Sequence, residues 1–184
     1  ALIKQTLAVW TREFLAHGER PDWLCVCSDE STGRLEHDEF VGSVYELGVD
    51  ATTNPAEVRR FLDRRTTDRR IVFSTYQSGH VLARATRQAG FEFDLGIMDE
   101  AHRTVGATDG SFSVLLHDHE IPMRRRLFMT ATERIVRGSD ETVLSMADEA
   151  VYGERFFELS FKQALEARPP ILSDYKIVTI AVTD

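Results

Sequence analysis

The hydrophobic residues of the chain repeat with two periods, one typical of helices and one typical of strands. Between residues 2 and 18 they recur every three or four positions, and Gly18 is suited to end the helix that this spacing predicts. The side chains on its apolar face are Ile3, Leu7, Trp10 and Phe14. The same period predicts further helices over residues 53–65, 78–90, 111–119 and 160–168, of which the last two are short.

Two of these helices begin with recognisable capping residues. Asn54 is suited to be an N-cap because Pro55 and Glu57 follow at the first and third helical positions. Ser160 is the expected cap of the helix over residues 160–168. These start signals make the helix boundaries more specific than hydrophobic spacing alone.

Five apolar runs predict strands between the helices. Several are nearly continuous instead of alternating, as expected when helices cover both faces of a sheet. The runs span residues 22–29, 70–77, 93–102, 125–132 and 174–182. Alternation of such strands with helices predicts an α/β fold, with three layers and a mostly parallel sheet.

Polar clusters follow three of the predicted strands. They read STYQSG at 74–79, DEAH at 99–102 and TAT at 130–132. Parallel strands place their carboxyl ends at one edge of the sheet, where α/β proteins bind ligands in a crevice. We therefore expect the three clusters to converge on one edge.

Asp99 and Glu100 stand side by side at the end of an apolar run. Their like charges repel unless a cation or solvent receives them. This arrangement suits magnesium-assisted phosphoryl transfer, with Asp99 holding Mg²⁺, usually through its water, and Glu100 orienting and deprotonating the water that attacks a γ-phosphate. The alternative is that the pair only begins a loop. A stand-alone metal hydrolase built on Asp99, Glu100 and His102 is disfavoured, because three side chains within four residues cannot easily encircle one ion.

Composition and charge limit the class of protein. The chain has 184 residues and a formal charge of −8, the wrong sign for binding nucleic acid over its whole surface. Arginines nevertheless cluster at 59–70 and 124–126, either as a local phosphate-binding face or as a solvated helix end. No apolar run is long enough to span a membrane. Cys25 and Cys27 fall on one strand face and are expected to be buried reduced thiols, which fits a cytoplasmic protein.

The motifs IMDEAHR (97–103) and FMTAT (128–132) resemble motifs II and III of the superfamily-two helicases and translocases, in their DEAH-box form. The surrounding sequence looks closest to the branch of restriction-enzyme motor subunits and related bacterial predicted helicases. Residues 2–10 resemble the helix after motif Ia, residues 72–79 the Ib/Ic segment, and residues 172–182 the strand leaving the first motor domain. The resemblance implies a RecA-like P-loop NTPase fold, with residues 1–184 forming a partial first motor domain.

The resemblance also implies roles for individual residues. Asp99 would coordinate Mg²⁺ and Glu100 would be the catalytic base for ATP hydrolysis, while His102 would link the nucleotide site to motif III. Motif III, which comprises Thr130, Ala131 and Thr132, would couple the state of the bound nucleotide to the binding of nucleic acid. The residues expected near the nucleic-acid backbone are Thr75, Gln77, Ser78 and Gly79. The alternative role for these last four residues is to hydrogen-bond the backbone of a turn at the end of the strand.

One central motif of the family is missing from the sequence. No segment reads G-x-x-x-x-G-K-[S/T], the Walker A loop that cradles the phosphates, and no second RecA-like domain is present. The sequence therefore predicts an incomplete motor that lacks the first strand, which carries the Walker A loop. The missing strand should leave one edge of the sheet free for self-association. The chain alone should hydrolyse ATP negligibly. The alternative function is a non-catalytic nucleic-acid- or protein-binding module derived from a helicase. The choice between DNA and RNA stays open.

Overall fold

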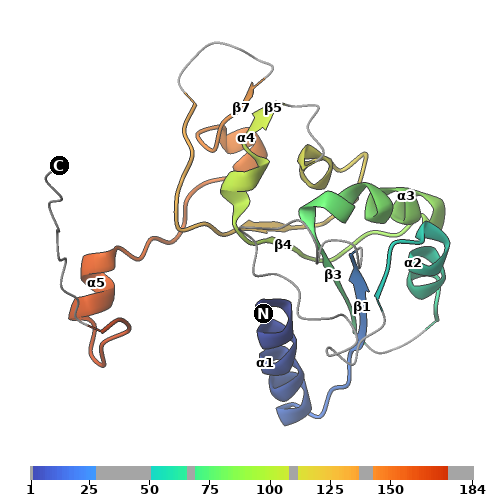
Figure 1. Cartoon of the computed structure of the whole chain (residues 1–184), viewed down its shortest axis with the longest axis horizontal. Coiled ribbons are helices and arrows are strands. Elements are labelled where there is room, and N and C mark those ends of the chain that lie inside the picture. The colour runs from blue at the N-terminus through green and yellow to red at the C-terminus, as the bar shows by residue number, and fades with distance from the viewer. Residues whose placement is uncertain (1, 28–50, 66–68, 108–111, 137–142, 174–184) are drawn as a thin grey trace, which may run out of the picture. The chain divides into compact units, whose positions relative to one another are not determined.

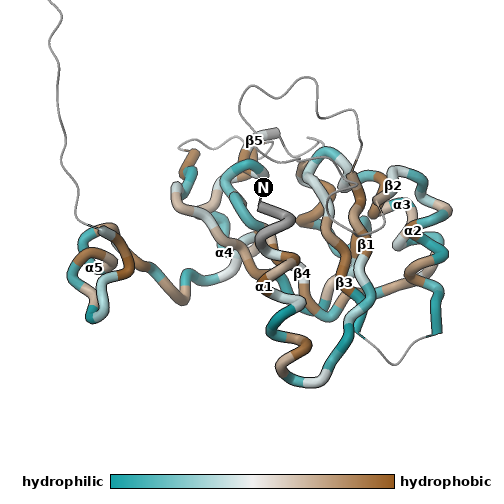
Figure 2. The backbone as a smooth tube through the Cα atoms, turned by 60° about the horizontal axis from the view of Figure 1, so that its bottom comes forward, coloured by the Kyte–Doolittle hydropathy of each residue, from teal (hydrophilic) through white to brown (hydrophobic). Residues whose placement is uncertain are grey.

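A three-stranded parallel sheet forms the first half of the fold. The computed structural model describes residues 2–27, 51–65, 69–107, 112–136 and 143–173. The strands β1 (Asp22–Val26), β2 (Ala51–Thr52) and β3 (Arg70–Ser74) lie in the order β2-β1-β3. In the register, Asp22 lies opposite Arg70 and Val26 opposite Ser74. Figure 2 shows the hydrophobic course of β1 and β3, in agreement with the predicted apolar runs.

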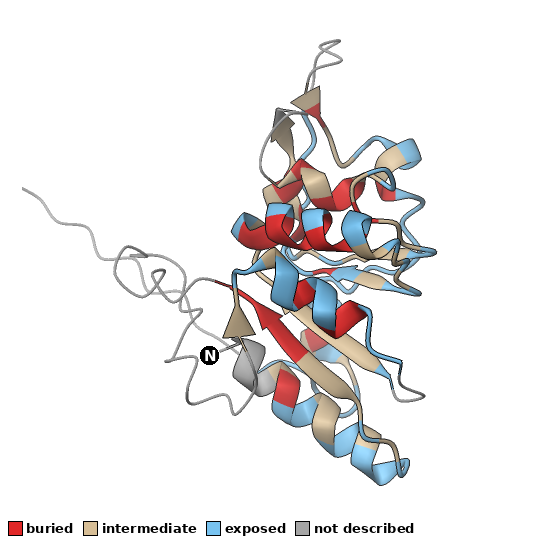
Figure 3. Ribbon diagram, turned by 90° about the vertical axis from the view of Figure 1, so that its right-hand side faces the viewer, coloured by how far each residue is buried: buried red, intermediate tan, exposed pale blue. Residues whose placement is uncertain are grey.

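Helices cover both faces of this sheet. On one face, α1 (Leu2–Ala16) places Trp10 at 6.4 Å from the Phe73 ring, and Trp23 stacks on Phe73 at 5.7 Å. On the other face, Leu24 and Val26 enter a core shared with α2 (Pro55–Leu62) and α3 (Gly79–Ala89). Figure 1 shows α1 on one side of β1 and β3 and the other two helices opposite, and Figure 3 shows buried residues where helices meet strands. The predicted three layers are present here.

The ends of α2 and α3 follow the sequence signals. Asn54 Oδ1 accepts a hydrogen bond from the Ala56 amide at 3.0 Å, as expected for an N-cap before Pro55. Gly90 ends α3 with φ 59°, a left-handed conformation that glycine adopts without a Cβ penalty. Both predicted helices are confirmed.

A second parallel pair continues the α/β pattern. Strand β4 (Gly96–Met98) pairs with β6 (Arg126–Phe128), with Gly96 opposite Arg126 and Met98 opposite Phe128. The predicted strands over 70–77, 93–102 and 125–132 are too long at their carboxyl ends. They end at Ser74, Met98 and Phe128, and a polar residue follows each of them within two positions. The predicted helix over 111–119 contains a 3₁₀ turn, Ser113–Leu116, with no α-helical turn.

Four short strands and helices were not predicted from the sequence, namely β2 and the three that follow here. Strands β5 (Gly106–Ala107) and β7 (Val143–Leu144) form an antiparallel pair, and α4 (Glu149–Tyr152) follows them. Tyr152 packs edge-on against Phe128 at 5.1 Å and joins a small core with Leu116 and Leu144. These elements are too short to produce a periodic hydrophobic signal.

The chain divides into two units, Ala1–Tyr152 and Gly153–Asp184. The second contains α5 (Phe161–Glu166), which begins with a complete capping box: Ser160 Oγ accepts from the Gln163 amide, and Gln163 Oε1 accepts from the Ser160 amide. The predicted Ser160 cap is confirmed. The predicted strand over 174–182 lies outside the described residues.

One expectation about the cysteines is met within the described ranges. Cys25 and Cys27 are buried thiols, as predicted. Burial raises the pKa of the Cys25 thiol to about 11. In the described part of the chain, every helix is too short or too polar to cross a bilayer.

Candidate functional site

The tips of β4 and β6 are joined by backbone hydrogen bonds that continue past the strands. The Met129 amide donates to the Met98 carbonyl oxygen at 2.9 Å, and the Ala101 amide then donates to the Met129 carbonyl oxygen at 2.9 Å. Because the strands are parallel, DEAH and TAT leave the sheet at the same end. The structure therefore brings the acid pair and the two threonines together, as the sequence predicts.

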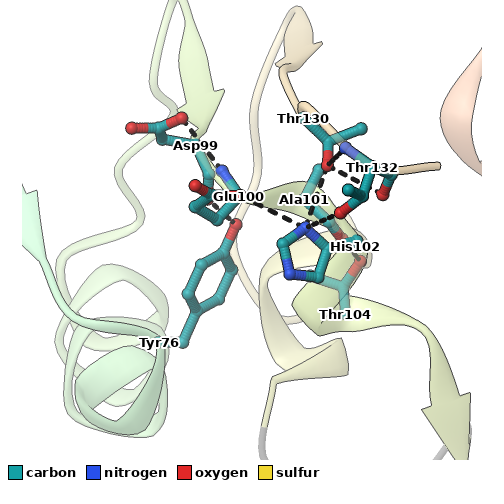
Figure 4. A network of polar contacts seen from close by, with 8 residues as sticks. All are labelled: Tyr76, Asp99, Glu100, Ala101, His102, Thr104, Thr130 and Thr132. Atoms are coloured by element: carbon teal, nitrogen blue, oxygen red, sulfur yellow. Dashed lines mark hydrogen bonds and ion pairs between the residues drawn. The ribbon is translucent and has the colours of Figure 1, made fainter. Parts of the chain in front are cut away.

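His102 is the centre of the side-chain contacts at this site. Its Nδ1 atom lies 2.9 Å from Thr130 Oγ1, 3.4 Å from Thr132 Oγ1 and 3.2 Å from Glu100 Oε2. Thr130 Oγ1 also accepts from the Thr132 amide at 3.2 Å, which closes the small turn around the exposed Ala131. Figure 4 shows this network between the two strand ends. One imidazole nitrogen thus contacts both predicted motifs.

The acid pair sits at a strained corner of the backbone. Glu100 has φ 53°, and within the described ranges it is the one residue other than glycine with a positive φ. This left-handed conformation costs an L-residue about 1–2 kcal/mol. The Glu100 amide is held by Asp99 Oδ1 at 3.0 Å. Strain of this kind persists where the surroundings impose it, and it occurs preferentially at functional sites.

The donor set at this corner fits a hydrated magnesium ion. Asp99 and Glu100 present exposed carboxylates, and hard oxygen donors are the ligands that Mg²⁺ prefers. Among the described residues, His, Cys, Asp and Glu side chains form no group of three or more that could enclose a metal. The pair could therefore hold an ion that keeps most of its waters and binds phosphate oxygens, while an enclosed structural metal does not fit.

The four residues expected near nucleic acid have different environments. Thr75 Oγ1 accepts from the Ser78 amide at 3.3 Å and caps a 3₁₀ turn, Tyr76–Ser78. Ser78 and Gly79 are buried at the start of α3, whereas Gln77 is exposed. Thr75 and Ser78 thus serve the turn, the role considered as the alternative, and the Gln77 side chain remains accessible.

Sequence reasoning did not identify the residues that tie this turn to the acid pair. The Tyr76 hydroxyl donates to the Asp99 carbonyl oxygen at 2.7 Å. On the other side of the site, Thr104 Oγ1 donates to the Ala101 carbonyl oxygen at 2.7 Å and lies 2.8 Å from the Tyr152 hydroxyl. Tyr76 stands within the predicted 74–79 cluster, but a tyrosine beside polar turn residues gives no signal of a distant backbone partner.

Part of each arginine cluster serves the fold. Arg126 is 13% exposed and donates to the carbonyl oxygens of Leu115 at 3.1 Å and Ile121 at 2.9 Å. Arg124 pairs with Glu92 at 3.0 Å. In the first cluster, the Arg70 guanidinium lies over the Phe91 ring at 4.6 Å. These contacts favour a structural role over a phosphate-binding face for the arginines that make them.

Two solved structures are similar to this chain. A nuclease-deletion mutant of the Type ISP restriction-modification enzyme LlaGI, in complex with a DNA substrate mimic, is 34% identical with a TM-score of 0.67, and the match covers 95% of this chain and 13% of that one. The ATP-dependent Type ISP restriction-modification enzyme LlaBIII bound to DNA is 27% identical with a TM-score of 0.59, covering 93% and 14%. No protein-family model and no curated protein matches the chain.

These similarities have two consequences. Together with the parallel strand pairs, they confirm the predicted α/β fold class and its RecA-like type. They also support a helicase-related family for the chain, because both neighbours are restriction-modification enzymes of one type. The chain spans 13–14% of the length of these neighbours.

Proposed function

We propose that residues 1–184 form part of the first RecA-like motor domain of an ATP-dependent DNA helicase or translocase of the DEAH-box type. The observation that carries this proposal is the meeting of two motifs at adjacent strand tips, with His102 Nδ1 2.9 Å from Thr130 Oγ1 and 3.2 Å from Glu100 Oε2. Similarity to ATP-dependent and DNA-bound restriction-modification enzymes supports it.

In this proposal each exposed acid has a separate task. Asp99 holds Mg²⁺, and that ion, when bound, neutralises charge that develops on the transferred phosphoryl group. Glu100 orients the attacking water and accepts its proton. Glu100 adopts its left-handed conformation at the tip of β4, and His102 contacts both its carboxylate and the Thr130 hydroxyl.

The threonines give the site a connection to nucleic-acid binding. Thr130 and Thr132 lie on the loop after β6, and both hydroxyls contact the histidine that follows the acid pair. Movement of this loop would displace His102 and with it the base. The proposed partner is DNA, because both similar enzymes are bound to DNA or a DNA mimic. Gln77, exposed at the end of β3, is the proposed contact to the DNA backbone.

The remaining parts of the motor would come from outside these residues. ATP binding needs a Walker A loop and a second RecA-like domain. The proposed location of the whole protein is the cytoplasm. Alone, the 184-residue chain should turn over ATP negligibly, because the acids have no positioned phosphate to act on. Association through a free sheet edge is proposed for the isolated chain.

The test is ATP turnover by the polypeptide encoded by the complete reading frame that contains these residues. We expect steady turnover that needs Mg²⁺ and rises when duplex DNA is added, and an Asp99→Asn variant that loses it at every Mg²⁺ concentration. DNA binding without any turnover would overturn the proposal in favour of the non-catalytic module. Turnover by the isolated chain, abolished by Glu100→Gln, would contradict its predicted inactivity.

A further inference from the structure

Tyr76 joins the turn at the end of β3 to the backbone of the acid pair. It follows Thr75, the cap of the turn, and precedes the exposed Gln77. Its hydroxyl donates to the carbonyl oxygen of Asp99 at 2.7 Å, across 23 sequence positions. Figure 4 shows the ring rising from the turn toward the corner between Asp99 and Glu100.

The hydrogen bond acts on the peptide group between the two acids. The carbonyl oxygen of that peptide accepts from Tyr76, and its amide is held by Asp99 Oδ1 at 3.0 Å. Both polar groups of the peptide are therefore fixed. This peptide leads directly into the left-handed conformation of Glu100, so its orientation determines where the Glu100 carboxylate points.

The ring of Tyr76 packs against neighbouring side chains. It is half-buried against the main core and packs on Phe112 with 5.5 Å between ring centroids. The Arg103 guanidinium lies over the other ring of this pair, 5.7 Å from the Phe112 centroid. Tyr76 thus contacts residue 99 directly through its hydroxyl, and it contacts Arg103 indirectly through the Phe112 ring.

We propose that Tyr76 is a positioning residue through which DNA contact at the neighbouring Gln77 sets the orientation of the Asp99–Glu100 peptide. This inference rests on the proposed function. DNA bound at the turn restrains Tyr76 further, so that its hydroxyl keeps the Asp99–Glu100 peptide in the orientation needed for hydrolysis. The role differs from that of a core tyrosine because it depends on the hydroxyl and on the presence of DNA.

The test compares Tyr76→Phe with Tyr152→Phe in the product of the complete reading frame. Each variant removes one hydroxyl that is hydrogen-bonded at or near the 3₁₀ helix 101–104. Each keeps the ring, which packs on Phe112 for Tyr76 and edge-on against Phe128 for Tyr152. We expect Tyr76→Phe to lower kcat for DNA-stimulated ATP turnover about 10-fold, with KM for ATP and Kd for DNA within about 2-fold. Tyr152→Phe should leave all three within about 2-fold.

Hydrogen exchange supplies a readout that does not depend on turnover. Addition of duplex DNA should slow exchange at residues 75–79 and at 99–101 in the unsubstituted protein, and only at 75–79 in Tyr76→Phe. Equal protection of 99–101 in both proteins, or equal kcat values for the two variants, would overturn the inference alone. Absence of protection at 75–79 in the unsubstituted protein would overturn the proposed DNA contact and the inference with it.

Discussion

The Nδ1 atom of His102 lies 2.9 Å from the Oγ1 atom of Thr130, although 28 positions separate these residues in the chain. The contact exists because β4 and β6 pair in parallel and release both residues at the same end. Glu100 Oε2 lies 3.2 Å from the same nitrogen. The predicted base and the predicted coupling motif therefore contact the same imidazole nitrogen.

Replacement of Thr130 by valine tests this link. Thr130→Val keeps the side-chain shape but removes the contacts of Oγ1 with His102 Nδ1 and the Thr132 amide. We expect DNA translocation per ATP hydrolysed to fall about 10-fold, because the loop after β6 no longer responds to His102. Unfolding free energy should fall by about 1 kcal/mol. The rate of translocation along DNA and the rate of ATP turnover, measured under the same conditions, give the distance moved per ATP hydrolysed.

Thr132→Val is the matched control for this change. Thr132 Oγ1 lies 3.4 Å from His102 Nδ1, a longer contact, and Thr132 is exposed. We expect a smaller loss of translocation per ATP. An equal loss in the two variants would show that the shorter contact has no special role.

Relief of strain at Glu100 should stabilise the chain. Glycine adopts positive φ without a Cβ penalty, so Glu100→Gly should raise the free energy of unfolding by about 1 kcal/mol. Asp99→Gly, at the neighbouring position without positive φ, should lower it. Urea denaturation of both variants measures the difference. A destabilised Glu100→Gly protein would argue that the corner is not strained.

Adjacent arginines should differ sharply in their contribution to stability. Arg126 is 13% exposed and donates to two carbonyl oxygens, so Arg126→Ala leaves those acceptors without a partner and should cost about 3 kcal/mol. Arg125 is exposed, and Arg125→Ala should change stability by less than about 0.5 kcal/mol. Thermal or urea unfolding measures both. Similar values for the two would remove the structural role assigned to Arg126.

The buried thiol of Cys25 predicts a loss of stability in alkali. Burial raises its pKa from 9.0 to about 11, and the nearby Cys27 adds to this effect. The thiol is favoured in the folded state, so its contribution is complete below pH 9 and is lost as pH rises from 9 to about 11. The loss should be about 2 kcal/mol over this window.

Cys25→Val removes this titration and isolates its effect. The variant should lose less stability than the unsubstituted chain between pH 9 and pH 11, measured by urea unfolding at each pH. Tyrosines also titrate in alkali in both proteins, so the difference between the two curves reports Cys25. If the unfolding free energies of the two proteins fell equally between pH 9 and pH 11, the loss of stability could not be due to the Cys25 thiol.

Elements with strong local signals could be predicted from the sequence. Asn54 and Gly90 bounded α2 and α3 correctly because capping depends on neighbouring residues alone. The meeting of Glu100, His102 and Thr130 followed from parallel strand order, which alternation of strands and helices predicts. Tyr76 and Tyr152 escaped prediction because their partners, Asp99 and Thr104, are distant in sequence and are selected by tertiary packing.

Glu100→Gln in the product of the complete reading frame tests the central claim most directly. The amide keeps the size of the side chain but cannot accept the proton of the attacking water. DNA-stimulated ATP turnover should fall at least about 100-fold, while binding of Mg²⁺ and ATP is retained. Turnover within a few-fold of the unsubstituted protein would show that Glu100 is not the base and that this corner is not the hydrolytic centre.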